Sequence, residues 1–264
     1  MLYLVATPIG NLSDITLRAL DVLRACDYVL CEDTRHSRLL LNHFDIQKPL
    51  KSHHKFNEAS SCQEIISDLK DGKNIALVSD AGTPGISDPG HLLVKQCRQA
   101  NVAVTALPGA CAAITALTLS GLPTQRFQFV GFLPKKEQEL RLLLIELLHY
   151  PGVSICYEGP HRLCDTLKAL GTYQVTVARE LTKLYEECLT APAQELLEHF
   201  NTNPPRGEIV LLIEGSPKFH SPLSPQEHVA QLQKDFCLSL NESIKLVAHL
   251  RNISKRDLYK EIHC

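Results

Sequence analysis

Short apolar runs and amphipathic stretches alternate along the first half of the chain. The runs are typical of buried strands and cover residues 2–6, 28–31, 74–79 and 102–107, with a shorter one near Leu50. The stretches between them repeat apolar positions at a helical period, which predicts helices over residues 16–26, 35–43, 58–69, 90–100 and 110–120. Strands without a polar face, separated by helices, indicate a mainly parallel sheet that is covered on both sides.

The pattern continues with a strand over residues 127–133 and then breaks at the polar segment PKKEQE, a candidate linker. Beyond it, strands are predicted over 153–158, 174–179 and 208–214, and helices over 137–149, 161–170 and 193–199. The segment PKFHSPLSPQ predicts a flexible connection to three short helices near 226–236, 242–250 and 255–263. We therefore expect two α/β domains, 1–133 and 137–215, and a helical appendix at 225–264.

Composition limits the class of protein. Of 264 residues, 44% are hydrophobic and 21% are charged, which are ordinary globular values. No apolar stretch approaches the roughly 18 residues of a membrane span. The start, MLYLVATPIGN, has no basic segment and breaks at Pro8, so it predicts a strand and not a signal peptide. The ten cysteines form no C-x-x-C pair, which favours reduced, mostly buried thiols in a cytoplasmic protein without a metal site.

Basic residues gather in two places although the net charge is −2. Residues 34–56 contain five Lys/Arg and four His against one acidic residue, and the chain from Asn241 onward has five Lys/Arg against three acids. Solvated protein faces would explain either cluster. The alternative explanation is a local surface for the phosphates of a nucleic acid.

Gly, Pro and small polar residues follow the predicted strands. They form ATPIGN (6–11), CEDTRHS (31–37), SDAGTPGISDPG (79–90) and LPGACAA (107–113). Ligands of open α/β sheets bind at these carboxyl ends of strands. Neither a G-x-G-x-x-G nor a P-loop pattern occurs. Gly admits a ligand close to the backbone and Pro fixes the loop shape, which suits a zwitterionic, adenine-bearing ligand better than a triphosphate. A tight turn remains the alternative for any one loop.

The same loops belong to a longer ordered set of motifs: VATPIGNLSDITLRA, CEDTRHS, VSDAGTPGISDPG, LPGACAAITALTLSGLP, GFLPKK, YEGPHRL, VARELTK and GEIVLLIEG. From about residue 2 to residue 215 this set resembles the tetrapyrrole methylase superfamily, and within it the branch that modifies ribosomal RNA. The resemblance implies two α/β domains with S-adenosylmethionine (SAM) in the cleft between them. It implies methyl transfer to the ribose 2′-hydroxyl of a cytidine in the decoding centre of 16S ribosomal RNA, by a homodimer that acts on the small ribosomal subunit.

The resemblance also assigns SAM-binding residues. Pro8 is expected at the floor of the cleft. The methionine end of SAM is expected against Asp80, Ala81, Gly82, Thr83 and Ile86 and against Ala110, Cys111, Ala112 and Ala113. The adenine is expected against Leu181, Thr182, Glu208 and Ile209. Two other acidic residues, Asp14 and Asp88, are better explained as N-caps of the helices that follow them.

Candidates on the substrate side are less sharply defined. Contacts with RNA are expected from Arg35, His53, His54, Lys55, Arg162 and Arg179. An ion pair with Glu32 is the alternative for Arg35, and an interdomain salt bridge is the alternative for Arg162 and Glu180. A 2′-hydroxyl is a poor nucleophile, so its methylation needs alignment and a general base. The candidates for that base are Asp80, Glu158, His161, Glu180 and Lys183, and the sequence does not choose among them.

Three other readings remain open. The chain resembles members of the same superfamily that methylate a tetrapyrrole or a side chain of a translation factor. It is also compatible with a non-catalytic ribosome-assembly factor that retains a SAM pocket. The last two helices, for which Asn241 and Ser254 are candidate N-caps, serve either as an RNA-docking module or as a small packed bundle.

Overall fold

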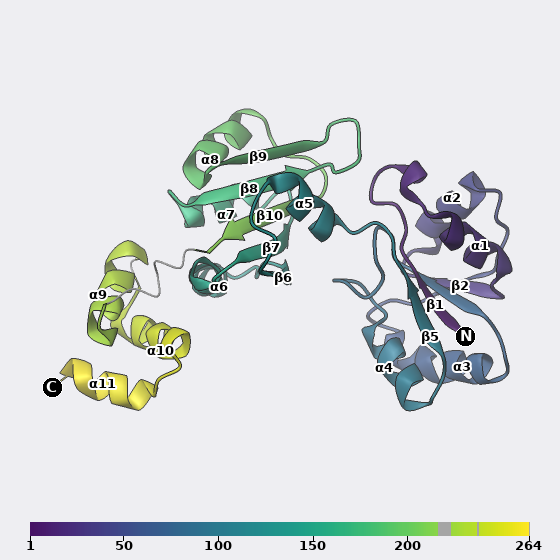
Figure 1. Ribbon diagram of the computed structural model, residues 1–264, viewed down its shortest axis with the longest axis horizontal. Coiled ribbons are helices and arrows are strands. Elements are labelled where there is room, and N and C mark those ends of the chain that lie inside the picture. Colours follow the sequence, from purple (N-terminus) through teal and green to yellow (C-terminus); the bar gives the residue numbers. More distant parts are fainter. Residues whose placement is uncertain (216–222, 237, 264) are drawn as a thin grey trace.

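Two sheets lie next to one another, and three helices form a separate group at the far side of the second sheet (Figure 1). This computed structural model describes residues 1–215, 223–236 and 238–263. The N-terminal sheet lies on the right of Figure 1 and the C-terminal helices lie on the left. Most of the predicted connection PKFHSPLSPQ falls outside the described residues.

The first sheet is entirely parallel, as predicted, with the strand order β3-β2-β4-β1-β5. Its strands are β1 (Leu2–Val5), β2 (Tyr28–Cys31), β3 (Leu50–Ser52), β4 (Ile75–Val78) and β5 (Val104–Leu107). The helices are α1 (Leu17–Ala25), α2 (Thr34–His43), α3 (Glu58–Lys70) and α4 (His91–Gln99), with a 3-10 turn η1 (Leu12–Asp14). Every residue of β2 and β4 is buried, because α1 and α2 pack on one face and α3 and α4 on the other.

The first and fourth helices begin at caps that differ from the predicted ones. Thr16 caps α1 by accepting a hydrogen bond from the amide of Ala19 at 3.1 Å. Asp14 lies inside the preceding 3-10 turn and makes no cap. The start of α4 is capped from another helix, since Glu58 Oε1 accepts from the amides of Gly90 at 3.0 Å and Leu92 at 3.1 Å. Asp88 therefore does not cap α4, contrary to the prediction.

The second sheet is mixed, with the order β6-β7-β10-β8-β9 and a single parallel pair, β6 with β7. Its strands are β6 (Phe127–Phe132), β7 (Val153–Glu158), β8 (Gln174–Arg179), β9 (Glu187–Pro192) and β10 (Ile209–Glu214). Its helices are α5 (Ala112–Ser120), α6 (Glu137–His149), α7 (Leu163–Leu170) and α8 (Ala193–Thr202). The sequence did not predict β9, because this edge strand lacks a clear apolar alternation and gains its order from pairing with β8.

The break between the two sheets falls after β5 and not at residue 133. Strand β6 is an edge of the second sheet, and α5 packs Ala113, Ala116 and Leu117 onto that sheet. The predicted boundary was wrong because the polar segment PKKEQE is the exposed entry to α6 and not a linker between domains. Leu133, directly before it, is buried in the core of the second domain.

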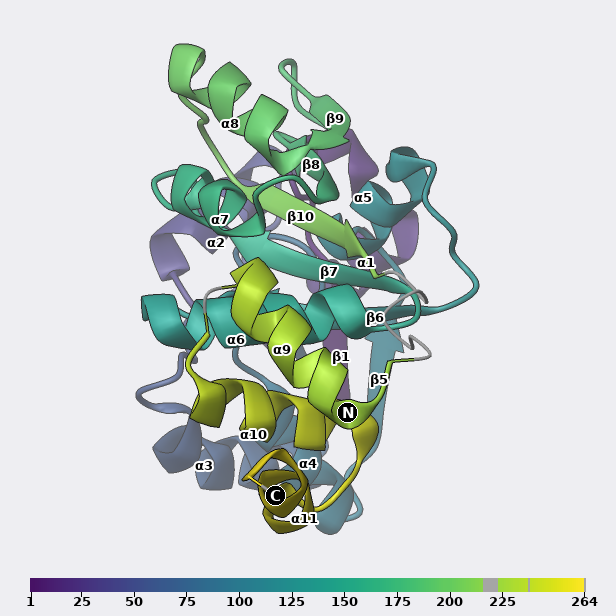
Figure 2. The same cartoon turned by 90° about the vertical axis from the view of Figure 1, so that its left-hand side faces the viewer.

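The appendix is a bundle of α9 (Pro225–Phe236), α10 (Leu240–Arg251) and α11 (Lys255–His263). Its core includes Ile145 of α6, which joins the bundle to the second domain (Figure 2). Ser239 and Glu242 form a capping box at the start of α10, so the predicted cap Asn241 lies inside the helix. Ser254 Oγ accepts from the amide of Asp257 at 3.4 Å at the start of α11, as expected of a cap.

A buried hydrogen-bonded chain crosses the same junction. Nε2 of His149 on α6 lies 3.2 Å from Nε2 of His228 on α9, whose Nδ1 accepts from Nε of Arg251 on α10 at 3.1 Å. Burial, His149 and Arg251 together lower the pKa of His228 to about 4. His228 is therefore neutral at neutral pH and holds the appendix to α6.

Five of the eight described cysteines are buried, in agreement with the sequence. The eight described cysteines are free, and burial raises the pKa of Cys97 to about 11 and that of Cys156 to about 12. In residues 1–215, 223–236 and 238–263, no helix combines the length and the apolar character that a membrane crossing needs. The same residues contain no group of three or more His, Cys, Asp or Glu arranged to hold a metal ion.

Candidate active site

Three of the Gly- and Pro-rich loops (6–11, 79–90 and 107–113), the cradle loops, meet at the carboxyl edge of the first sheet. Backbone hydrogen bonds join Thr7 to Gly82 in both directions, at 2.9 and 3.1 Å. Ser79 Oγ donates to the carbonyl of Gly82 at 2.8 Å, and Thr83 Oγ1 donates to the carbonyl of Ala110 at 3.0 Å. Gly82 has a φ of 80°, a backbone conformation that side chains rarely adopt. The loops are therefore fixed in advance of any ligand.

The loop after β1 reaches across to the second domain. Ile9 packs in one cluster with Leu181, within the turn that joins β8 and β9. In that turn both Glu180 and Thr182 have positive φ, 50° and 65°, although neither is glycine. Lys183 Nζ forms an ion pair with Glu180 Oε1 at 2.8 Å. Two strained residues in one short turn are typical of a functional segment.

A cavity of about 370 Å³ opens between the domains, a size within the range of small-molecule sites. Residues of both domains line it: Ile9, Glu32, Asp80, Ala81, Gly82, Thr83, Ile86, Ser87, Asp88, Cys111, Ala112, Phe132, Tyr157, Glu158, Gly159, Pro160, Gly207, Glu208, Ile209 and Val210. Nine of the fourteen residues assigned to the cofactor are in this set: Asp80, Ala81, Gly82, Thr83, Ile86, Cys111, Ala112, Glu208 and Ile209.

A second cavity of about 420 Å³ adjoins the first. The two share Ile9, Asp80, Ala81 and Glu208. The second cavity is otherwise lined by Thr7, Pro8, Gly10, Leu12, His36, Leu39, Leu40 and Lys183. Asp80 and Glu208 therefore stand at the junction of two compartments, one facing the cradle loops and one facing α2.

The first cavity is strongly acidic. Its lining residues include Glu32, Asp80, Asp88, Glu158 and Glu208, of which Glu158 has a fully buried side chain. Burial raises the pKa of Asp88 to about 6, and the nearby charges of Glu32, Asp80 and Glu208 add to this rise. A crowded set of carboxylates is relieved by a cation, so the electrostatics favour a positively charged ligand.

Five residues assigned to the cofactor lie outside the first cavity. Ala113 and Leu181 are buried in the cluster behind it, Thr182 belongs to the turn that supports the loop after β1, and Ala110 accepts the hydrogen bond from Thr83. Pro8 lines the second cavity. The sequence did not assign Phe132, Tyr157, Gly159 or Pro160 to the cavity. The motif YEGPHRL, directly after the apolar core of β7, was the signal that could have placed three of them.

Three of the predicted RNA contacts are already engaged within the protein. The His53 side chain is 0% exposed, and its Nδ1 lies 3.0 Å from Ser61 Oγ, so it is not available to a phosphate. Arg162 donates to the carbonyl oxygens of Leu133 at 3.0 Å and of Pro134. Arg179 pairs with Glu187 across the β8–β9 ladder. His53 was misjudged because the sequence cannot show that it turns under α3.

The structure also shows which ion pairs Arg35, Arg162 and Glu180 form. Arg35 pairs with Asp33 at 2.8 Å, two residues away, and not with Glu32. Arg162 pairs with Glu158 at 3.3 Å and Glu180 pairs with Lys183. Both of these pairs lie within the second domain, so among the described residues neither Arg162 nor Glu180 forms the interdomain salt bridge that was the alternative for each.

The candidates for the general base differ in where they lie relative to the two cavities. Glu158 is 2% exposed and accepts hydrogen bonds from Thr166 Oγ1 at 2.7 Å and from the amide of Gly159 at 2.8 Å, which suits a structural anchor. His161 is exposed and lines neither cavity. Lys183 lines the second cavity in its pair with Glu180. Asp80 lines both cavities.

Two α/β domains with a ligand cleft at fixed strand-end loops are what the resemblance to tetrapyrrole methylases implies. Comparison with family models confirms this class of protein. The family model for Tetrapyrrole (Corrin/Porphyrin) Methylases matches residues 1–197, so the chain belongs to this family. Members of the family take their methyl group from SAM, which is accordingly the cofactor of this chain.

Individual curated proteins resemble the chain over nearly its full length. The chain is 45% identical to "Ribosomal RNA small subunit methyltransferase I" of Halalkalibacterium halodurans, over 99% of this chain and 94% of that protein. It is 46% identical to the protein of the same name from Escherichia coli O157:H7, over 98% and 93%. Among solved structures, uroporphyrin-III C-methyltransferase from Thermus thermophilus in complex with S-adenosyl homocysteine has a TM-score of 0.56 and 18% identity, over 81% of this chain and 97% of that one.

Proposed function

We propose that this chain transfers a methyl group from SAM to the ribose 2′-hydroxyl of a cytidine in the decoding centre of 16S ribosomal RNA. The observation that carries the proposal is the pair of adjoining cavities, one acidic and lined by the cradle loops, the other open beside α2. The near full-length similarity to proteins named for small-subunit ribosomal RNA supports RNA as the substrate. Homodimer formation stays a prediction.

The first cavity fits SAM. Its volume of about 370 Å³ suits a small cofactor, and Gly82 adds no side chain to its lining. The lining carboxyl groups complement the positive sulfonium and ammonium groups of SAM. We assign Asp80, Asp88 and Glu208 to this charge balance, and Tyr157, Ile209 and Val210 to the apolar wall.

The protein has two tasks in the reaction. Bound SAM supplies an activated methyl group that needs an oxygen nucleophile in line with it. The chain must hold the ribose in the second cavity, where alignment alone contributes about 7–11 kcal/mol to such reactions. The chain must also remove the hydroxyl proton, and a positioned base is worth about 10²–10⁴-fold in rate.

We assign the base to Asp80, because it lines both compartments. The amide of Asp33 donates to its Oδ1 at 3.3 Å, which orients the carboxylate. Oδ2 is then the atom that takes the proton from the 2′-hydroxyl. Lys183, paired with Glu180 at 2.8 Å, lies on the second cavity and is assigned to the phosphate of the substrate nucleotide.

The affinity for SAM is expected to rise with pH between about 5 and 7. The pKa of Asp88 is raised to about 6, so its carboxyl is neutral below that pH and negative above it. A cationic ligand binds the negative form better, so the dissociation constant should fall several-fold across this window. Calorimetric titration with SAM at fixed salt checks this result. Asp88→Asn should bind SAM with little change over the same pH range, and a pH dependence that survives in this variant would contradict the assignment.

Methyl transfer decides between this proposal and its alternatives. Small ribosomal subunits, naked 16S ribosomal RNA and uroporphyrinogen are incubated separately with the protein and SAM labelled in its methyl group. We expect label in the RNA of the subunits, and mass spectrometry should place it on a ribose of the decoding centre. Label in uroporphyrinogen, or in a protein of a translation extract, would favour another methylase of the same family. SAM binding without transfer to any of them would favour a non-catalytic assembly factor.

A further inference from the structure

A phenylalanine that is almost fully exposed stands at the tip of the turn between β3 and α3. Phe56 is 97% exposed, and its neighbours along the chain are His54, Lys55 and Asn57. Exposed apolar side chains are common on protein surfaces and need no explanation by themselves. Phe56 differs because hydrogen bonds fix the turn that carries it and because this turn is attached to the 79–90 loop.

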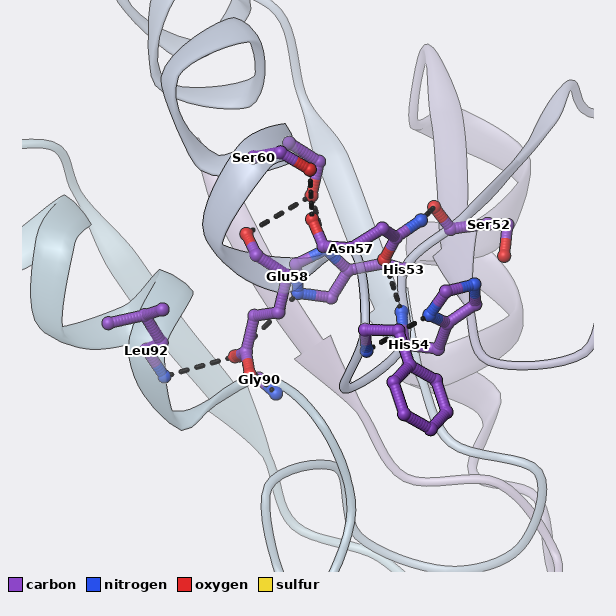
Figure 3. A network of polar contacts seen from close by, with 10 residues as sticks. Ser52, His53, His54, Asn57, Glu58, Ser60, Gly90 and Leu92 are labelled. Atoms are coloured by element: carbon purple, nitrogen blue, oxygen red, sulfur yellow. Dashed lines mark hydrogen bonds and ion pairs between the residues drawn. The ribbon is translucent and has the colours of Figure 1, made fainter.

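The turn is fixed by its own hydrogen bonds (Figure 3). The amide of His54 donates to Asn57 Oδ1 at 2.7 Å, and Asn57 Nδ2 donates to the carbonyl of Ser52 at 3.0 Å. The amide of Phe56 donates to His54 Nδ1 at 3.2 Å, which brings the two rings within 5.9 Å, edge to face. Phe56 is therefore displayed by a rigid turn, and little freedom is left to lose on binding a partner.

The turn is also attached to the 79–90 loop, which is one of the cradle loops. Glu58 follows the turn directly and binds the amides of Gly90 and Leu92, at the end of the 79–90 loop (Figure 3). His53 lies under the turn with its Nε2 3.8 Å from the same Glu58 oxygen. The positive charge of Lys55 acts on Asp88, which lines the first cavity. A ligand on Phe56 would thus lie beside the cleft and not on a remote surface.

We propose that Phe56 is a stacking platform for an unpaired base of the RNA substrate, adjacent to the nucleotide that enters the cleft. This inference rests on the proposed function. Sequence-specific and single-stranded RNA is commonly held by aromatic side chains that stack on splayed bases while basic residues meet the phosphates. Phe56 supplies the aromatic face and the adjacent Lys55 supplies the cation, since Arg35 and Lys51 of the same segment pair with acidic residues. The Lys55 charge beside the ring favours the phosphates of RNA over a second protein, because lysine is depleted at protein interfaces.

The test measures binding of small ribosomal subunits and of naked 16S ribosomal RNA at several salt concentrations. Phe56→Ala should weaken binding roughly 5- to 150-fold at every salt concentration, the range found for loss of one stacked base. The slope of log affinity against log salt should stay unchanged, because no charge is removed. Lys55→Ala should instead lower that slope by about 1. Phe56→Trp should restore binding, and Phe56→Leu should not.

Two controls separate stacking from damage to the fold. Leu17→Ala removes another apolar side chain, 81% exposed, from the far helix α1, and it should leave RNA affinity unchanged. Phe56→Ala should keep the SAM affinity and the urea midpoint of the wild type, since its side chain is exposed.

Each outcome decides the matter. If the wild type methylates the subunits and Phe56→Ala or Phe56→Leu binds and reacts like it, the stacking proposal is overturned and the proposed function stands. If Phe56→Ala changes the oligomeric state by light scattering but not the RNA affinity, Phe56 contacts a second copy and the proposal is again overturned. If the wild type neither binds nor methylates the RNA, both proposals fail together.

Discussion

Asp80→Asn is expected to lower methyl-transfer turnover by about 10²- to 10⁴-fold at saturating SAM, the range attributed to a positioned general base. The substitution keeps the size of the side chain and removes its ability to take a proton. Asp80 stands where the two cavities meet, and the amide of Asp33 orients its carboxylate from 3.3 Å. Single-turnover kinetics with small ribosomal subunits measure the chemical step, and calorimetry measures SAM affinity separately. We expect SAM affinity to fall by about tenfold or less, because one of several lining carboxylates is lost.

Glu208→Gln is the matched control for this experiment. Glu208 also lines both cavities, so its substitution removes a negative charge from the same junction. We expect this variant to bind SAM more weakly and to retain turnover once SAM is saturating. Turnover that falls equally in both variants would point to the charge of the junction and not to a proton acceptor. Turnover that survives Asp80→Asn would contradict the assignment of Asp80 as the base.

Gly10→Ala should weaken both the fold and the SAM site. A Cβ at residue 10 would lie 2.6 Å from Lys183 Cγ and 2.8 Å from both the carbonyl of Leu181 and Thr182 Oγ1. These atoms belong to the turn of the second domain that contacts the loop after β1, so one of the two segments must shift. Overpacking of this kind costs about 1–3 kcal/mol in free energy of unfolding. Because Pro8 and Ile9 line the cavities, we also expect SAM affinity to fall about tenfold or more.

Urea unfolding and SAM titration of Gly10→Ala test this prediction. Gly121→Ala is the control, since Gly121 ends α5 with a φ of 71° and has no atom within 4 Å of an added Cβ. It should lose about 1 kcal/mol in free energy of unfolding through backbone strain alone, with SAM affinity unchanged. If Gly10→Ala matched the wild type in both measurements, the two domains would not be held together by this contact.

Several parts of the fold followed from local patterns, and others did not. Strands β2 and β4 were predictable because parallel strands buried on both faces are apolar throughout. Strand β9 was not, since its half-buried residues gain their order from the ladder with β8. The domain boundary failed for a related reason. A polar segment is equally typical of a linker and of an exposed helix entry, and only the packing of Leu133 and α5 shows which it is.

The sequence by itself determined the strand-helix order of the first domain, the loops at the strand ends and the family to which the chain belongs. These properties reside in residues that are neighbours along the chain, where period, Gly and Pro act locally. The tertiary structure alone decided that His53 is buried, that Asp88 joins the acidic cavity while Glu58 caps α4, and that Asp80 faces two compartments. Burial and electrostatic environment depend on groups tens of residues apart in the sequence, and only packing brings those groups together.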